Sequence, residues 1–225
     1  MKLGWAQNAD GVELDLWLSK DGKLIVFHDK DTKRFEPVAR AITNLTLAEA
    51  RQIDVGSWKG VQFKGEPIPT LESILATIPK GKRIVLEIKD GPHLIPEFTR
   101  VLKASGVEEK KLVVISFNFA SLAASKQDWP QVDHYFLMDY QRDAKTQKFP
   151  ELAPLIKRAK SAGFEGLNLS SKWPLPKEAV SEVKAAGLKM YVWTVDDADL
   201  ARALASAGGD GITTNRPEWL RGQLE

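Results

Sequence analysis

Short β-rich runs alternate with amphipathic helical patterns along almost the whole chain, and this alternation limits the possible folds more than any other feature of the sequence. Because strands that are joined through helices usually run parallel, the pattern predicts an α/β fold built on a parallel sheet. The seven candidate strands are residues 12–18, 83–88, 112–117, 134–138, 166–170, 189–194 and 211–214.

The segments between these strands carry apolar residues at three- and four-residue spacing, which predicts amphipathic helices. Glycines that follow several of them are typical of helix C-termini. Residues 24–27 follow the first strand after a short turn, so we expect a hairpin, and residues 29–69 form a long insertion with one short helix. The expected helices are residues 45–53, 70–78, 94–105, 119–127, 151–163, 177–187 and 197–209.

The faces of the strands decide between a closed and an open sheet. Side chains alternate across a strand, so Glu13 and Asp15 share one face, as do Glu87 and Lys89 on a second strand. Trp193 lies at the end of a third. A TIM (β/α)8-type barrel gathers such side chains at the carboxyl ends of its strands, and we predict this fold. An open, doubly wound sheet ranks second, because no glycine-rich turn follows a strand to hold a pyrophosphate.

Composition restricts the class of protein further. With 225 residues, 43% of them hydrophobic, the chain can bury one substantial core, and we expect residues 1–225 to form a single domain. The 32 basic residues nearly balance the 30 acidic ones, which argues against a nucleic-acid partner. No apolar run approaches the roughly 20 residues of a membrane span. The chain lacks cysteine, which fits a reducing compartment, so we expect a cytoplasmic protein without membrane insertion.

Three acids at one rim of the barrel would repel one another unless a cation lay between them. Glu13, Asp15 and Glu87 offer only oxygen ligands, which favours Mg²⁺ or Ca²⁺. A divalent ion beside the ammonium of Lys89 suits a phosphate ligand, and His28 can transfer protons. The residues therefore predict a metal-assisted site for phosphoryl chemistry.

At these positions the sequence resembles the glycerophosphodiester phosphodiesterase family, within the phospholipase C-like phosphodiesterase superfamily. The series ELD, HD, PTL, EIK, WTV and DGI follows the order of the family and extends nearly end to end. The matching segments are residues 11–29, 45–58, 68–75, 86–89, 116–118, 185–195 and 208–220.

The resemblance implies a hydrolase of lipid and glycerol metabolism that cleaves glycerophosphodiesters to glycerol 3-phosphate and an alcohol with the help of a divalent metal. It implies that residues 29–69 cap the site on the glycerol side. It also implies the roles of individual residues: Glu13, Asp15 and Glu87 as metal ligands, His28 as one of two catalytic histidines, Lys89 near the phosphate, and Trp193 as an aromatic wall.

One departure from the family pattern is large. Its first strand, which ends in His-Arg-Gly, and the Pro-Glu-Asn-Thr that follows it are absent, and residues 1–10 read as the tail of the first helix. A barrel without this strand has two unpaired edges and a gap in its wall. We expect closure between the flanking strands, the N-terminal segment, or a second copy in a homo-oligomer to cover the gap.

The missing motif removes one catalytic histidine. His93 lies in a turn and His134 begins its strand at the opposite end of the barrel, so neither replaces it. We therefore expect a metal site that persists with reduced turnover. The alternative is a non-catalytic barrel that binds glycerophosphodiesters or a metal, and a third possibility is an aldolase-like site in which Lys89 forms a Schiff base.

Overall fold

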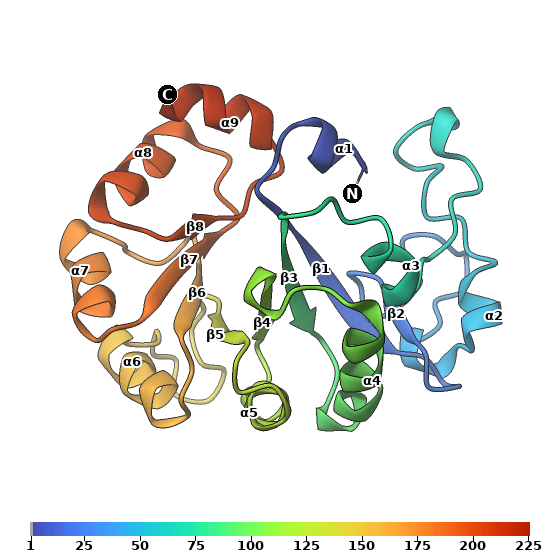
Figure 1. Ribbon diagram of the computed structural model, residues 1–225, viewed down its shortest axis with the longest axis horizontal. Helices are drawn as coiled ribbons and strands as arrows, with labels where there is room; N and C mark the ends of the chain where they lie inside the picture. Colours follow the sequence, from blue (N-terminus) through green and yellow to red (C-terminus); the bar gives the residue numbers. More distant parts are fainter. Residues whose placement is uncertain (1) are drawn as a thin grey trace.

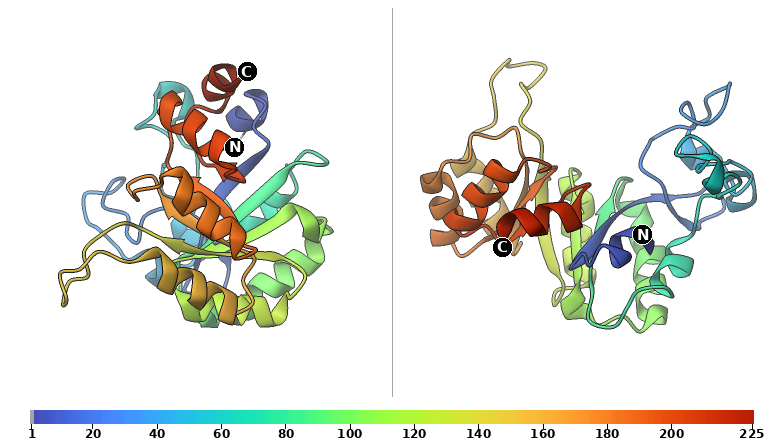
Figure 2. Two further views of the ribbon diagram at one scale, coloured as in Figure 1. Left: turned by 90° about the vertical axis from the view of Figure 1, so that its left-hand side faces the viewer. Right: turned by 90° about the horizontal axis from the view of Figure 1, so that it is seen from above.

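The computed structural model describes residues 2–225, and Met1 lies outside the described part. Its centre is one eight-stranded sheet in the order β2-β1-β3-β4-β5-β6-β7-β8, in which β2 is antiparallel to β1 and every other pair is parallel. Figures 1 and 2 show the sheet curled into part of a barrel. The strands are β1 (Gly11–Leu18), β2 (Leu24–Val26), β3 (Arg83–Ile88), β4 (Leu112–Ser116), β5 (Asp133–Met138), β6 (Gly166–Ser170), β7 (Lys189–Trp193) and β8 (Gly211–Ile212).

Helices cover the outer face of the curled sheet (Figure 1). Asn118 and Asp197 cap the N-termini of two helices with their side-chain oxygens. Gly106 ends a third helix and Gly208 ends the helix that Asp197 begins, both in the left-handed conformation that glycine adopts without strain. The helices are α1 (Lys2–Ala6), α2 (Leu47–Ala50), α3 (Leu71–Leu75), α4 (Ile95–Ser105), α5 (Phe119–Asp128), α6 (Leu152–Ser161), α7 (Lys177–Ala185), α8 (Ala198–Ala207) and α9 (Pro217–Leu224). None of the helices in residues 2–225 has the length and apolar character needed to cross a bilayer.

The curled sheet does not close. Within residues 2–225, β8 pairs with β7 and β1 pairs with β2 and β3, but β8 and β1 do not pair with each other. A cavity of about 1190 Å³ lies between them, lined by Gly11, Val12 and Glu13 on one side and Gly211 and Ile212 on the other. The prediction of seven barrel strands with a gap in the wall is confirmed, although the last strand is only two residues long.

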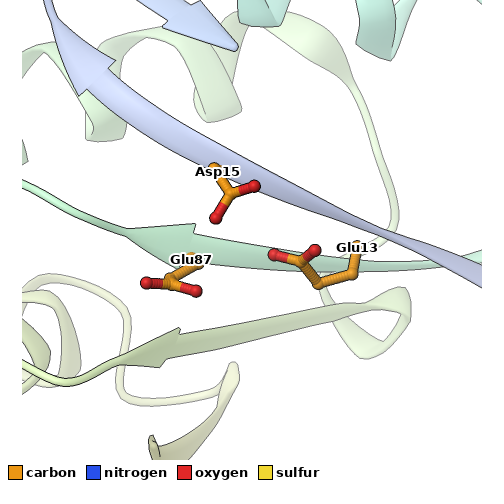
Figure 3. Close-up of side chains that lie close together, drawn as sticks. All are labelled: Glu13, Asp15 and Glu87. Atoms are coloured by element: carbon orange, nitrogen blue, oxygen red, sulfur yellow. The ribbon is translucent and has the colours of Figure 1, made fainter. Parts of the chain in front are cut away.

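The register of β1 on β3 places the predicted acids together. Asp15 lies directly opposite Glu87, and Glu13 lies two residues earlier on the same face of β1 (Figure 3). Leu14 and Leu16, which alternate with these acids along β1, point to the other face, where both are buried in the main core beneath the helices. This alternation places the acids on the inner face of the sheet, beside a second apolar cluster that includes Val85 and Ile115.

The insertion at residues 29–69 packs around its own small apolar cluster, which includes Ile42, Leu45 and Ile53. Its helix α2 is shorter than the predicted segment 45–53, because a capping box at Thr46 starts it and a turn follows Ala50. The rest of the insertion is turns and loops with two short 3-10 helices, Ile42–Asn44 and Val61–Phe63. We call residues 29–69 the cap, and the assignment of the whole chain to one domain stays a prediction.

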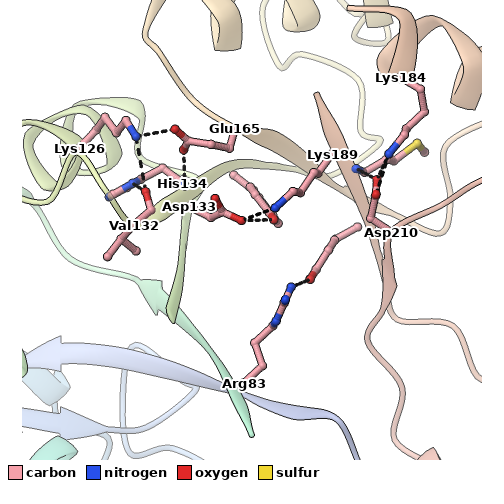
Figure 4. Close-up of polar contacts among 12 residues, drawn as sticks. Arg83, Lys126, Val132, Asp133, His134, Glu165, Lys184, Lys189 and Asp210 are labelled. Carbon is pink, nitrogen blue, oxygen red and sulfur yellow. Dashed lines mark hydrogen bonds and ion pairs between the residues drawn. The ribbon is translucent and has the colours of Figure 1, made fainter. Parts of the chain in front are cut away.

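The N-terminal end of the barrel carries a buried histidine. His134 accepts a hydrogen bond from the Ser125 hydroxyl at Nε2 (2.9 Å) and donates from Nδ1 to the carbonyl of Val132 (2.8 Å), as befits a neutral ring. Figure 4 shows the ion pair of Lys126 and Glu165 beside it. Burial lowers the pKa of His134 to about 4, and the charge of Lys126 acts in the same direction. The ring is part of the structure and lies far from the predicted site.

We expect this histidine to make the protein sensitive to acid. Its pKa falls from 6.5 to about 4 on folding, so protonation costs the folded state up to roughly 3 kcal/mol, and stability decreases as pH falls through 6.5 toward 4. Chemical unfolding of His134→Gln across this range should give a flatter pH dependence than the unmodified chain. The exposed His93→Gln is the matched control, and a parallel dependence in the unmodified chain and His134→Gln would contradict this role.

Candidate active site

Three carboxylates form the centre of the site. One oxygen from each of Glu13, Asp15 and Glu87 lies within 4.8 Å of the others, and Figure 3 shows the three side chains turned toward one another from neighbouring strands. Glu87 is only 7% exposed. The structure thus brings the three predicted metal ligands together at one place on the inner face of the sheet.

Lys89 bridges two of the acids. Its ammonium lies 3.2 Å from Asp15 Oδ1 and 3.1 Å from Glu87 Oε1, and its side chain is mostly buried. Burial alone would lower the pKa of Lys89, but the negative charges of Glu87 and Asp15 outweigh this effect and raise it. A lysine held in its charged form is a poor nucleophile, which argues against the Schiff-base chemistry considered from the sequence.

The negative charge of the cluster exceeds what one lysine can balance. Burial, followed by the charges of Asp15 and Glu87, raises the pKa of Glu13 well above its usual value. Burial also raises the pKa of Glu87 to about 7, with Asp15 adding to the shift and Lys89 opposing it. Without a further cation, Glu13 and Glu87 therefore hold a proton more readily than free carboxyl groups do.

An unpartnered oxygen shows where a cation fits. Glu13 Oε1 is buried and has no hydrogen-bond partner anywhere in residues 2–225. A buried carboxylate oxygen without a partner is costly, and two further carboxylates lie beside it. The donor set consists of oxygens, which suits a hard divalent cation such as Mg²⁺ or Ca²⁺. The residues present therefore fit the metal implied by the sequence.

His28 follows β2 and remains accessible. Its Nδ1 lies 2.8 Å from Asp29 Oδ1, and its side chain is 70% exposed. In its charged form the imidazole is near enough to Glu87 to lower the pKa of that carboxyl. The contact with Asp29 orients the ring and leaves Nε2 free to exchange a proton. The sequence analysis placed Asp29 at the start of the insertion and did not predict this contact.

Aromatic side chains stand at the carboxyl ends of the strands. Trp193 ends β7, and its ring packs edge to face against Phe117, with centroids 5.7 Å apart and an interplanar angle of 86°. Its indole N–H donates to the carbonyl of Asn168 at 3.3 Å. Phe117 follows β4 and is 45% exposed. It belongs to the predicted strand 112–117 and to the matching segment 116–118, but no role was predicted for its side chain.

The other histidines lie where the sequence predicted. His93 is exposed in the turn after β3, with Nε2 3.3 Å from Asp90 Oδ2. His134 is buried at the opposite end of the barrel. Among residues 2–225, His28 is thus the histidine that the structure associates with the carboxylates.

Comparisons with known proteins agree with this geometry. The model of the glycerophosphoryl diester phosphodiesterase family matches residues 1–219. A glycerophosphodiester phosphodiesterase of Caldanaerobacter subterraneus subsp. tengcongensis is 33% identical over 98% of this chain and 86% of its own. One from Bacillus subtilis is 30% identical over 93% of this chain and 75% of its own.

A solved structure is similar in fold and in sequence. A phosphodiesterase of Oleispira antarctica, in complex with the product sn-glycerol-3-phosphate, superposes with a TM-score of 0.86 at 29% identity, over 99% of this chain and 87% of that one. The family match, the relatives and the shared fold confirm the resemblance seen in the sequence. The chain belongs to the glycerophosphoryl diester phosphodiesterase family.

Proposed function

We propose that this chain hydrolyses glycerophosphodiesters to glycerol 3-phosphate and an alcohol, with Glu13, Asp15 and Glu87 holding a divalent cation. The observation that carries the proposal is the buried, unpartnered oxygen of Glu13 beside two other carboxylates. The glycerol 3-phosphate bound by the Oleispira relative supports the substrate class. Mg²⁺ and Ca²⁺ both suit the oxygen ligands.

Each residue has a distinct task in the proposed reaction. In hydrolysis, an oxygen nucleophile bonds to phosphorus, and the bond from phosphorus to the alcohol oxygen breaks. Lys89 places a positive charge beside the phosphate oxygens, and His28 Nε2 exchanges a proton with the attacking or the leaving oxygen. Trp193 and Phe117 form an apolar wall against the substrate. A bound cation would supply further stabilisation of the charge on the phosphate.

The second candidate function is binding without efficient turnover. It is favoured by the position of the histidines, because His28 is near the carboxylates while His93 and His134 are held elsewhere. In this case the chain binds glycerol 3-phosphate or the cation in calorimetric titrations but releases little product. The cytoplasmic location stays a prediction from composition.

Replacement of His28 distinguishes the two functions. We expect His28→Gln to lower kcat for glycerophosphocholine by about 10²–10⁴-fold, because the proton transfer is lost. Release of glycerol 3-phosphate gives the rate, and His93→Gln is the control that should retain it. If the unmodified chain has no activity above background, or if both variants lose it equally, His28 is not the catalytic acid or base.

Replacement of Glu13 tests the cation site. We expect Glu13→Gln to weaken binding of Mg²⁺ or Ca²⁺ on the order of 100-fold, because one of three charged ligands is lost. Isothermal titration calorimetry measures this directly, and Asp31→Asn, in the first turn of the cap, is the matched control. Equal affinity in all three proteins would place the cation elsewhere.

The same cluster predicts a pH dependence. Because the pKa of Glu87 is raised from 4.5 to about 7, its protonated form is favoured in the fold, and the metal-free chain should lose stability as pH rises through this range. Glu87→Gln should flatten this dependence in chemical unfolding with chelator present. Cation affinity should rise over the same range, since binding displaces the proton.

We also propose that a second copy of the chain covers the open edge between β1 and β8. The two edges carry backbone groups that do not pair with each other, and Leu3 of α1 lines the same cavity while 67% exposed. Light scattering should give the mass of a dimer, and Leu3→Glu should reduce it to that of a monomer. Val38→Glu, which changes an exposed apolar residue of the cap, should leave the dimer intact; a monomeric unmodified chain would refute the proposal.

A further inference from the structure

A loop of the cap, residues 55–66, is built to hold a fixed shape. Its two ends pair, since Val55 N donates to Glu66 O at 2.9 Å, and Asp54 and Pro67 form a bridge just outside them. In Figure 1 this loop stands away from the curled sheet at the upper right. We call residues 55–66 the cap loop.

Asp54 fastens the cap loop from its base. Its carboxylate accepts hydrogen bonds from Gly56 N (2.9 Å), from Ser57 N (3.0 Å) and Oγ (2.6 Å), and from Gly65 N (2.9 Å). Gly56 packs so closely on the opposite limb that a Cβ there would lie 1.8 Å from Phe63 O. These contacts fix the path of the backbone on both sides of the tip.

The fixed loop presents large apolar side chains to water. Val61 is 86% exposed, Trp58 54% and Phe63 46%. The Trp58 indole N–H donates to Val55 O at 2.9 Å, which holds the ring in this position. Apolar surface in water is unfavourable, and a concentration of it on one preorganised loop is typical of an interaction surface.

The charges on the cap loop indicate which partner it fits. The cap loop contains Lys59 and Lys64, both exposed, and its one acid, Glu66, lies at the base of the loop and not at its tip. The Lys59 ammonium and the Arg34 guanidinium each lie 5.0 Å from the Trp58 ring, so positive charge surrounds the aromatic group. Tryptophan together with lysine is the combination favoured at the boundary between lipid headgroups and acyl chains.

A protein partner fits less well. Stable protein interfaces bury about 800 Å² on each side and are depleted in lysine, whereas the cap loop offers three apolar side chains on a narrow tip. Such a tip can enter the headgroup layer of a bilayer, and its lysines would then lie among anionic phosphates.

We propose that the cap loop docks the protein on the surface of an anionic phospholipid bilayer, with Trp58, Val61 and Phe63 inserted among the headgroups. The contact is peripheral and reversible, and it does not depend on the hydrolysis proposed above. It brings the site close to a surface from which phosphodiesters derived from lipids are released.

Vesicle sedimentation tests this docking. The full chain should sediment with vesicles that contain phosphatidylglycerol and phosphatidylcholine, and much less with vesicles of phosphatidylcholine alone or at high salt. Val61→Asp should lower the partition coefficient at least about tenfold, because it puts a charge in place of the most exposed apolar group. Lys59→Glu with Lys64→Glu should reduce binding to the anionic vesicles in particular.

The matched control is Val38→Asp, which adds the same charge at another exposed apolar position of the cap and should bind as the unmodified chain does. Thermal unfolding and hydrolysis of soluble glycerophosphocholine should be unchanged in Val61→Asp, which separates docking from folding and from the proposed activity. Docking is refuted if the unmodified chain stays in solution with anionic vesicles. It is equally refuted if Val61→Asp binds these vesicles as strongly as the unmodified chain. It is also refuted if Val38→Asp loses binding equally.

Discussion

The parallel pairing of β1 with β3 is the constraint on which the site depends. In this register Asp15 faces Glu87 across the ladder and Glu13 lies on the same side, while Leu14 and Leu16 are buried under the helices. A slip of one residue would turn the acids into the apolar core and the leucines into the site. The burial of these leucines therefore also fixes the separation of the carboxylates. The same β1–β3 hydrogen bonds determine which side chains enter the core and which side chains form the site.

The crowding of acids gives the site a preference for cations before any ligand binds. Lys89 balances part of the charge, while burial, together with the neighbouring acids, raises the pKa of Glu13 and of Glu87. An arrangement of this kind is costly to the folded state, because buried charges lose their hydration. The packing of the neighbouring strands holds the carboxylates in place. The repulsion between them, which lowers the stability of the fold, also favours the binding of a divalent ion.

The sequence predicted the structure well wherever apolar residues recurred at a regular spacing or side chains shared one face of a strand. It located every barrel strand and placed Glu13, Asp15 and Glu87 together, because alternation along a strand decides which side chains share a face. It could not reveal the Asp29 contact of His28 or the packing of Phe117 on Trp193, because these depend on loop paths and on strands distant in sequence. The cap was the least predictable part, since turns and single side-chain caps such as Asp54 determine its shape.

The strands near the open edge differ in how completely they are paired with their neighbours. In a closed barrel every strand is held by two neighbours, but here the two residues of β8 are held on one side, at β7, within the part of the chain that the structure describes. Such a strand belongs to the units that open at the lowest free energy, and its amides should exchange with solvent earliest. β3 is paired on both sides, whereas β1 pairs with β2 only over Leu16–Leu18, so Glu87 lies inside the sheet while Glu13 borders the open edge. Fluctuations of this edge therefore reach Glu13 before Glu87.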